Sequence, residues 1–269
     1  TPGALHVTAD QLNGKLFGSD FVALTLGNGQ TGDVTIDGVN VDNHVAIQTG
    51  AANKVTIGTN GLTVAANRRV TLRTGSIENS GGAGTMSVGA GGTLSLNTNS
   101  IANLAANGSN PSVTGTGTLG IGTYDGSKTI GLGNAATGDL LLPDTKFGTV
   151  FGPGFTHYSI GDGAQGTINV NGSSLAKDVT LQANTINFAG DLTLAAGKTL
   201  TVNAKTAAQQ TAGKITAANV AALGGNIKLD QANEIGTIAA DALSVDVKSN
   251  ALTIGAVTIP AGSPTAQTA

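Results

Sequence analysis

Residues 179–202 read VTLQANTINFAGDLTLAAGKTLTV. The stretch holds three short apolar triplets, Val179-Thr180-Leu181, Ile186-Asn187-Phe188 and Leu192-Thr193-Leu194, and the pattern restarts at Leu200. Alternate side chains of a strand point to opposite faces, so the outer pair of each triplet faces one side and the central residue the other. The steps from 179 to 186, 192 and 200 place three strands in each repeat.

The same triplet recurs along most of the chain. Val34 and Val55 each begin an aliphatic-Thr-aliphatic triplet and are separated by the same interval as Val179 and Leu200. Residues tolerant of tight turns, mainly Gly, Asn, Asp and Ala, lie between the triplets. This rhythm predicts an all-β fold, a right-handed parallel β-helix (solenoid) with three-sided coils of about 20 residues. At this coil length the chain holds about thirteen coils, which stack and bury one another's aliphatic side chains.

The composition agrees with a narrow aliphatic interior. Aromatic residues make up 3% of the chain and charged residues 11%, with 41 Gly and no Cys. The net charge is -3 with 13 basic residues in all, whereas nucleic-acid binding uses many clustered cations, so no nucleic-acid partner is expected. The sequence contains no apolar run of about 18 residues, so no transmembrane helix is predicted.

Other folds explain the pattern less well. The triplets are shorter than the roughly 9–11 residues that a strand of a transmembrane barrel needs, and a β-sandwich expects larger core residues. The stretch Ala204–Leu223 lacks helix breakers and is either a side excursion or further coil. We predict one shaft over residues 1–259, with an irregular middle segment at about 97–165. Residues 260–269, with Pro260 and Pro264, read as a tail or linker.

The chain resembles the large exoproteins of the filamentous-haemagglutinin type, which two-partner systems secrete in Gram-negative bacteria. The resemblance covers roughly residues 20–259 and is carried by the strand-coil repeat with its Ile-Gly steps: Ile130-Gly131-Leu132-Gly133, Gly138-Asp139-Leu140-Leu141-Leu142, Tyr158-Ser159-Ile160-Gly161, Val179-Thr180-Leu181-Gln182-Ala183-Asn184 and Ala189-Gly190-Asp191-Leu192-Thr193-Leu194.

This resemblance implies a β-helical shaft, a location in the medium or on the outer bacterial surface, and a role in adhesion, aggregation or biofilm. It also implies an outer-membrane transporter as a partner during secretion, and exopolysaccharides or host or bacterial surface glycans as binding partners. The family's amino-terminal secretion domain carries Asn-Pro motifs, and here Asn110-Pro111 is the sole Asn-Pro. The chain therefore resembles an interior piece of such a protein.

Aromatic residues gather in one Gly- and Pro-rich segment. Phe147, Phe151, Phe155 and Tyr158 lie close together in sequence, and His157 is beside them. Exposed rings offer a large contact area to a sugar or protein partner, which makes Phe151, Phe155, His157 and Tyr158 candidate ligand-binding residues. The alternative interpretation is that the rings fill or cap an irregular coil.

The arginines form a second candidate site. The chain contains three, Arg68, Arg69 and Arg73, and in a strand Arg69 and Arg73 share the outward face with Thr71. This face is either a site for an anionic glycan or an ordinary solvated surface. His6, His44 and His157 are isolated and no His/Asp/Glu group has metal-ligand spacing, so we expect no metal and no cofactor.

The acidic residues leave a catalytic alternative open. Parallel β-helices include polysaccharide lyases and hydrolases that use acidic side chains, and Asp33, Asp37 and Asp42 lie near one another in sequence, as do Asp139, Asp144 and Asp162. Many of the Asp residues are next to Gly or Asn, which is typical of turns. We therefore expect a non-enzymatic structural and adhesive segment. A carbohydrate-active enzyme is the alternative, and an ice-binding array of outward Thr is a third hypothesis.

Overall fold

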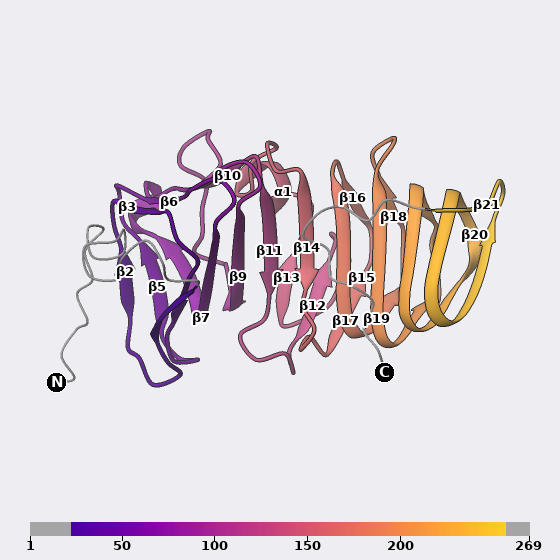
Figure 1. Cartoon of the computed structure of the whole chain (residues 1–269), viewed down its shortest axis with the longest axis horizontal. Coiled ribbons are helices and arrows are strands. Elements are labelled where there is room, and N and C mark those ends of the chain that lie inside the picture. The colour runs from indigo at the N-terminus through magenta and orange to yellow at the C-terminus, as the bar shows by residue number, and fades with distance from the viewer. Residues whose placement is uncertain (1–22, 257–269) are drawn as a thin grey trace. The chain divides into compact units, whose positions relative to one another are not determined.

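A computed structural model describes residues 23–256. Its strands are parallel and form a β-solenoid of about nine turns, with 58% strand and 3% helix (Figure 1). The predicted all-β parallel β-helix is therefore confirmed. The described residues form two compact units, residues 23–119 with 148–155 and residues 120–147 with 156–256. The single shaft over residues 1–259 stays a prediction, and the tail at 260–269 lies outside the described residues.

The first unit has three stacks of strands, one for each side of the coil. Successive coils pair in register, as Val34 does with Val55 and Val70 with Leu94. The first stack holds β1 (Leu24–Gly27), β4 (Val45–Gln48), the start of β7 (Arg69–Asn79) and the start of β9 (Thr93–Ser100); the second holds β2 (Val34–Ile36), β5 (Lys54–Ile57) and the end of β7; the third holds β3 (Val39–Val41), β6 (Leu62–Val64), β8 (Met86–Val88) and β10 (Val113–Gly115).

The second unit repeats this arrangement with longer strands that turn from one side to the next. The first stack holds β14 (His157–Gly161) and the starts of β17 (Asp178–Phe188) and β19 (Thr199–Gln210), with part of β20 (Ile215–Ser249); the second holds β12 (Thr129–Leu132), β15 (Thr167–Val170) and later parts of β17, β19 and β20; the third holds β16 (Ser173–Leu175), β18 (Leu192–Leu194) and the start of β20. The other elements are η2 (Ser80–Gly82), β11 (Thr118–Gly122), β13 (Leu140–Leu142), α1 (Lys146–Thr149) and β21 (Thr253–Ile254).

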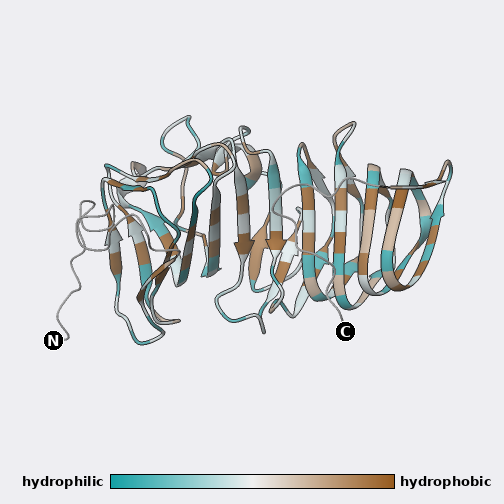
Figure 2. Ribbon diagram, in the orientation of Figure 1, coloured by the Kyte–Doolittle hydropathy of each residue, from teal (hydrophilic) through white to brown (hydrophobic). Residues whose placement is uncertain are grey.

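The core consists of columns of aliphatic side chains. Val179 pairs with Leu200 on the next coil, and Leu200 pairs with Val220 on the coil after that. All three side chains are fully buried, and each contributes roughly 1.5–3 kcal/mol through removal from water. Figure 2 shows the resulting alternation of hydrophobic and hydrophilic residues along the strands.

The outward position of the central Thr is confirmed in part. Thr35 and Thr193 are exposed, as the period of two predicts. The prediction is wrong for Thr180 and Thr201, which are fully buried although the aliphatic residues on either side of them face the core. At Thr180 the neighbouring coil contributes to the cover, since the Nε2 atom of His157 lies 2.9 Å from the Thr180 Oγ1 atom. Strand alternation thus predicts which way a side chain points, but not whether other residues bury the outward-facing side chain.

The high glycine content follows from close coil-to-coil contact. A Cβ atom on Gly75 would collide with the backbone carbonyl of Ala51 on the preceding coil. Gly213 has a φ of +73°, and a Cβ atom there would collide with the backbone of Gly190. Neither position has space for a side chain, and at Gly213 the left-handed φ also disfavours one.

One further expectation needs correction, and one open alternative is resolved. The described chain has about nine turns rather than thirteen, because corners lengthen some coils: Val34 pairs with Val55, but Val45 pairs with Val70. Ala204–Leu223 is further coil, divided between β19 and β20, and not a helical excursion. The irregular middle segment contains α1, and a part of it, residues 148–155, belongs to the first unit, where Phe151 bridges to Val113.

Candidate functional site

An outward face of the first unit gathers the arginines. On β4, β7 and β9 the inward residues Val45, Val70 and Leu94 are buried, and the alternate positions point away from the core. Register aligns these positions into a grid of three coils by three columns. We call it the basic face; its residues are His44, Ala46 and Gln48 on one coil, Arg69, Thr71 and Arg73 on the next, and Thr93, Ser95 and Asn97 on the third.

A tight corner positions the start of the arginine row. The Arg68 N–H donates to the Ala65 carbonyl at 3.2 Å, which closes a turn, and Asn67 has a left-handed φ of 59°. Asn tolerates this conformation better than most residues. Strand β7 then begins at Arg69, so Arg68 lies on the corner and Arg69 on the flat face.

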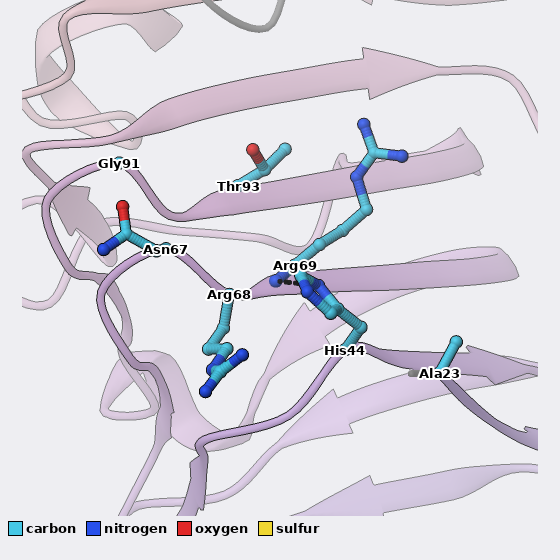
Figure 3. A pocket seen from close by; sticks show the side chains of 7 residues that line it. All are labelled: Ala23, His44, Asn67, Arg68, Arg69, Gly91 and Thr93. Atoms are coloured by element: carbon cyan, nitrogen blue, oxygen red, sulfur yellow. Dashed lines mark hydrogen bonds between the residues drawn. The ribbon is translucent and has the colours of Figure 1, made fainter. Parts of the chain in front are cut away.

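A side-chain hydrogen bond joins His44 to the next coil. The backbone N–H of Arg69 donates to the Nδ1 atom of His44 at 3.2 Å. This bond assigns the proton of the neutral ring to Nε2, which leaves a donor on the outer side of the ring. Both residues line an open depression with Arg68 and Thr93, and Figure 3 shows Arg68 and Arg69 extending in opposite directions from the start of β7.

The nine residues of the basic face include two arginines and several hydrogen-bond donors, and none of the nine is Asp or Glu. Arg68, Arg69 and Arg73 are exposed. Within residues 23–256, neither Arg68 nor Arg69 forms an ion pair. The structure therefore brings the predicted residues Arg69 and Arg73 together on one face and adds His44, which the sequence did not connect to them.

The four candidate ligand-binding residues of the aromatic segment are all buried, and Phe147 beside them is half-buried. In the first unit Phe151 and Phe155 are both fully buried. The Gly152 N–H donates to the Val113 carbonyl at 2.7 Å, which holds the segment against β10. A buried ring is inaccessible to a glycan, so burial contradicts the ligand-binding interpretation. The alternative interpretation, that these rings fill an irregular coil, agrees with the structure.

His157 and Tyr158 of the second unit are buried as well, with 2% and 3% of their surface exposed. The Tyr158 ring lies 4.9 Å from the Phe147 ring, centroid to centroid, at 55°. Burial raises the pKa of Tyr158 to about 12, because the interior disfavours the charged phenolate. These two residues are therefore packing residues and not a ligand platform.

Three of the six candidate catalytic acids, Asp33, Asp37 and Asp144, bind backbone N–H groups of a neighbouring coil. Asp139 accepts from the Thr129 N–H, and Asp42 accepts from the side chain of Asn43. Asp125 and Asp162 form the local turns that the sequence predicts, by accepting the N–H of Ser127 and Ala164. The bonds between coils also involve Asp178 and Asp191, which were not candidates. Carboxylates of one coil accept hydrogen bonds of 2.7–3.0 Å from backbone N–H groups of another: Asp33 from Lys54, Asp37 from Asn60, Asp144 from Ser174, Asp178 from Thr199 and Asp191 from Lys214.

We call these carboxylate-to-backbone hydrogen bonds between coils clamps. A sequence pattern predicts three of them, although each Asp also fits a turn. Asp33, Asp178 and Asp191 each stand immediately before an aliphatic-Thr-aliphatic triplet. The carboxylate therefore lies at a coil corner. Its hydrogen-bond donor is the residue immediately before the matching triplet of the next coil. At Asp33, the N–H of Lys54 and the side chain of Asn53 hold the pKa of the carboxyl group below its usual value.

Each of the two glutamates of the chain pairs with the lysine whose backbone N–H donates to such an Asp. The Lys54 Nζ atom lies 2.6 Å from Glu78 Oε1, and the Lys214 Nζ atom lies 2.8 Å from Glu234 Oε1. The order Asp, Lys, Glu on successive coils thus occurs once in each unit. The Lys54 ammonium group lowers the pKa of Glu78.

Within residues 23–256, no three His, Cys, Asp or Glu side chains are grouped so that they could hold a metal ion. No helix in this range is long and apolar enough to cross a membrane. His6 lies outside it. Comparison with protein families, curated proteins and solved structures found no match to this chain.

Proposed function

We propose that this chain is a structural and adhesive β-solenoid segment of a secreted bacterial surface protein. In this proposal it attaches cells to one another, to surfaces or to polysaccharide, without catalysis. The secreted location and an outer-membrane transporter partner belong to the same proposal and derive from the resemblance to filamentous-haemagglutinin-type exoproteins.

The observation that supports the proposal most is the different placement of acidic and basic groups. Carboxylates such as Asp33 and Asp191 bind backbone N–H groups of neighbouring coils, so their chemistry is used within the solenoid. Arg69 and Arg73 face outward on a flat array of polar side chains. A scaffold that engages its acids internally and presents its arginines externally is suited to attachment.

Coil stacking supports the structural part of the proposal. Each coil buries its aliphatic residues against its neighbours, so stability is gained one coil at a time. A chain that folds in this way gains structure progressively as it emerges from a transporter, and it needs no disulfide to close its core.

Bead attachment tests the adhesive function. Beads coated with the folded chain, with heat-unfolded chain or with albumin are applied to bacterial cells and to layers of exopolysaccharide. We expect greater retention of beads with the folded chain. Equal retention of all three beads on every surface would refute adhesion. Release of unsaturated sugar products from the polysaccharide would refute the non-catalytic part and favour a lyase.

A further inference from the structure

We propose that the basic face binds a linear polysaccharide whose anionic groups, uronate carboxylates or sulfate esters, repeat along the polymer. This inference rests on the proposed adhesive function and assigns its ligand class and its site. The polymer lies along β7, across the direction in which the coils stack.

The spacing of the arginines gives the direction. Arg69 and Arg73 are four positions apart on one strand, or about 13 Å at a rise of about 3.3 Å per residue. The positions beside Arg69 on adjacent coils hold His44 and Thr93, and those beside Arg73 hold no cation. The two arginine positions therefore lie in a row along β7 and not in a column along the stack, and Arg68 precedes this row at the corner.

The arrangement favours several separate anionic groups over one small ion. The side chains of Arg68 and Arg69 extend in opposite directions (Figure 3), so they do not converge on a shared anion. A polymer that presents one anionic group to each arginine gains from simultaneous contacts, since the second contact forms at a high effective concentration. A single uronate or sulfate ion gains no such advantage.

The neighbouring side chains suit a sugar. Guanidinium groups bind carboxylate and sulfate oxygens through paired N–H donors. Gln48 and Asn97 flank Arg73 with amide groups, and Thr71 and Ser95 offer hydroxyl groups between the columns. Amides and hydroxyls can both donate and accept, which matches the hydroxyl groups of a glycan.

A nucleic acid fits this face less well. Binding of single strands uses aromatic side chains on which bases stack, and binding of duplexes draws on many phosphate contacts. The basic face contains no Phe, Tyr or Trp, and the whole chain has a net charge of -3. An acidic polysaccharide, with a lower charge density and no bases, needs neither feature.

The test measures binding of the full chain to four polymers: heparin for sulfate esters, polygalacturonate for carboxylates, neutral dextran, and duplex DNA. The double variant Arg69→Ala/Arg73→Ala removes the row. Lys205→Ala/Lys248→Ala is the matched control, because it removes the same charge from two lysines of the second unit that lie away from the basic face in sequence. Circular dichroism and the thermal midpoint confirm that each variant is folded.

We expect heparin or polygalacturonate, or both, to bind in preference to dextran and DNA. The arginine variant should bind about tenfold more weakly, from about threefold for each exposed charged contact, while the lysine variant binds as the wild type does. Affinity should fall as salt rises, with a shallower slope for the arginine variant. Free galacturonate should fail to compete at equal concentration of sugar units.

Equal affinity of the arginine variant and the wild type would overturn the site, and equal losses in both variants would reduce it to general charge attraction. Preference for DNA would overturn the ligand class, as would competition by the free sugar. Bead adhesion without arginine-dependent binding would leave the adhesive function and refute this site. Arginine-dependent binding without bead adhesion would support this site and refute the adhesive function.

Discussion

Replacement of Asn233 by Ala tests how much the buried polar contacts between coils stabilise the second unit. The Asn233 side chain is fully buried. Its Oδ1 atom accepts from the Ile215 N–H at 2.8 Å and from the Gln210 amide at 2.9 Å. Its Nδ2 atom donates to Gln210 Oε1 and to the Leu229 carbonyl, both at 2.9 Å.

The expected cost follows from the groups left without partners. Ile215 is fully buried, so its N–H loses a partner in a place that water does not reach. Gln210 loses both bonds to Asn233 and keeps a bond of 3.0 Å to the Gly213 carbonyl. At about 1–3 kcal/mol for each buried unsatisfied group, Asn233→Ala should lower the free energy of unfolding by about 3–5 kcal/mol.

Urea unfolding followed by far-ultraviolet circular dichroism measures the change, because the chain contains no Trp. Hydrogen exchange should show faster opening of β19 and β20, since solenoids open locally. The control is Gln209→Ala, which changes an exposed neighbour of Gln210 and should cost less than about 0.5 kcal/mol. Equal effects of Asn233→Ala and Gln209→Ala would refute the reasoning.

Three other perturbations test the core, the clamps and the ion pairs. Leu181→Ala, in a fully buried position, should cost about 2–5 kcal/mol in urea unfolding, whereas Thr193→Ser on an exposed position should cost little; equal effects would contradict the strand register. Asp191→Ala should lower the free energy of unfolding by about 1 kcal/mol and speed hydrogen exchange of the Lys214 backbone N–H, which donates to Asp191. Unchanged exchange would argue against the clamp. Because Lys54 lowers the pKa of Glu78, the stability from this pair is present above the ordinary pKa of 4.5 and is lost as pH falls through the lowered value. Acid titration of stability should therefore be shallower for Glu78→Gln than for the wild type as pH falls below the ordinary pKa of 4.5, and identical titrations would contradict the pairing.

The fold was predictable because its information is local and repeated. The period of two within Val179-Thr180-Leu181 assigns the inward residues, and the regular interval to Leu200 assigns the column. The side chains that cover the outward-facing residues of a coil do not follow this period. Thr180 is therefore buried where the alternation alone predicts exposure, because the alternation does not show that His157 lies against it.

The candidate site was predictable only in part, for a related reason. The shared face of Arg69 and Arg73 follows from strand geometry. The contact of His44 with Arg69 depends on a corner that lengthens this coil, and corner length has no clear sequence rule. The aromatic segment was misjudged because Gly and Pro around Phe151 resemble an exposed loop, although the chain returns there to fill a coil.

The repeat at the start of β14, β17 and β19 also governs how the length of the second unit can change. His157, Asp178 and Thr199 occupy equivalent positions on three successive coils. Loss of residues 178–198 would join Lys177 to Thr199 and bring the next coil against β14 with every column still aligned. A length change inside a strand would instead shift aliphatic residues out of the interior, whereas the corners already differ in length from coil to coil. Gain or loss of whole coils is therefore a form of length variation that this architecture tolerates.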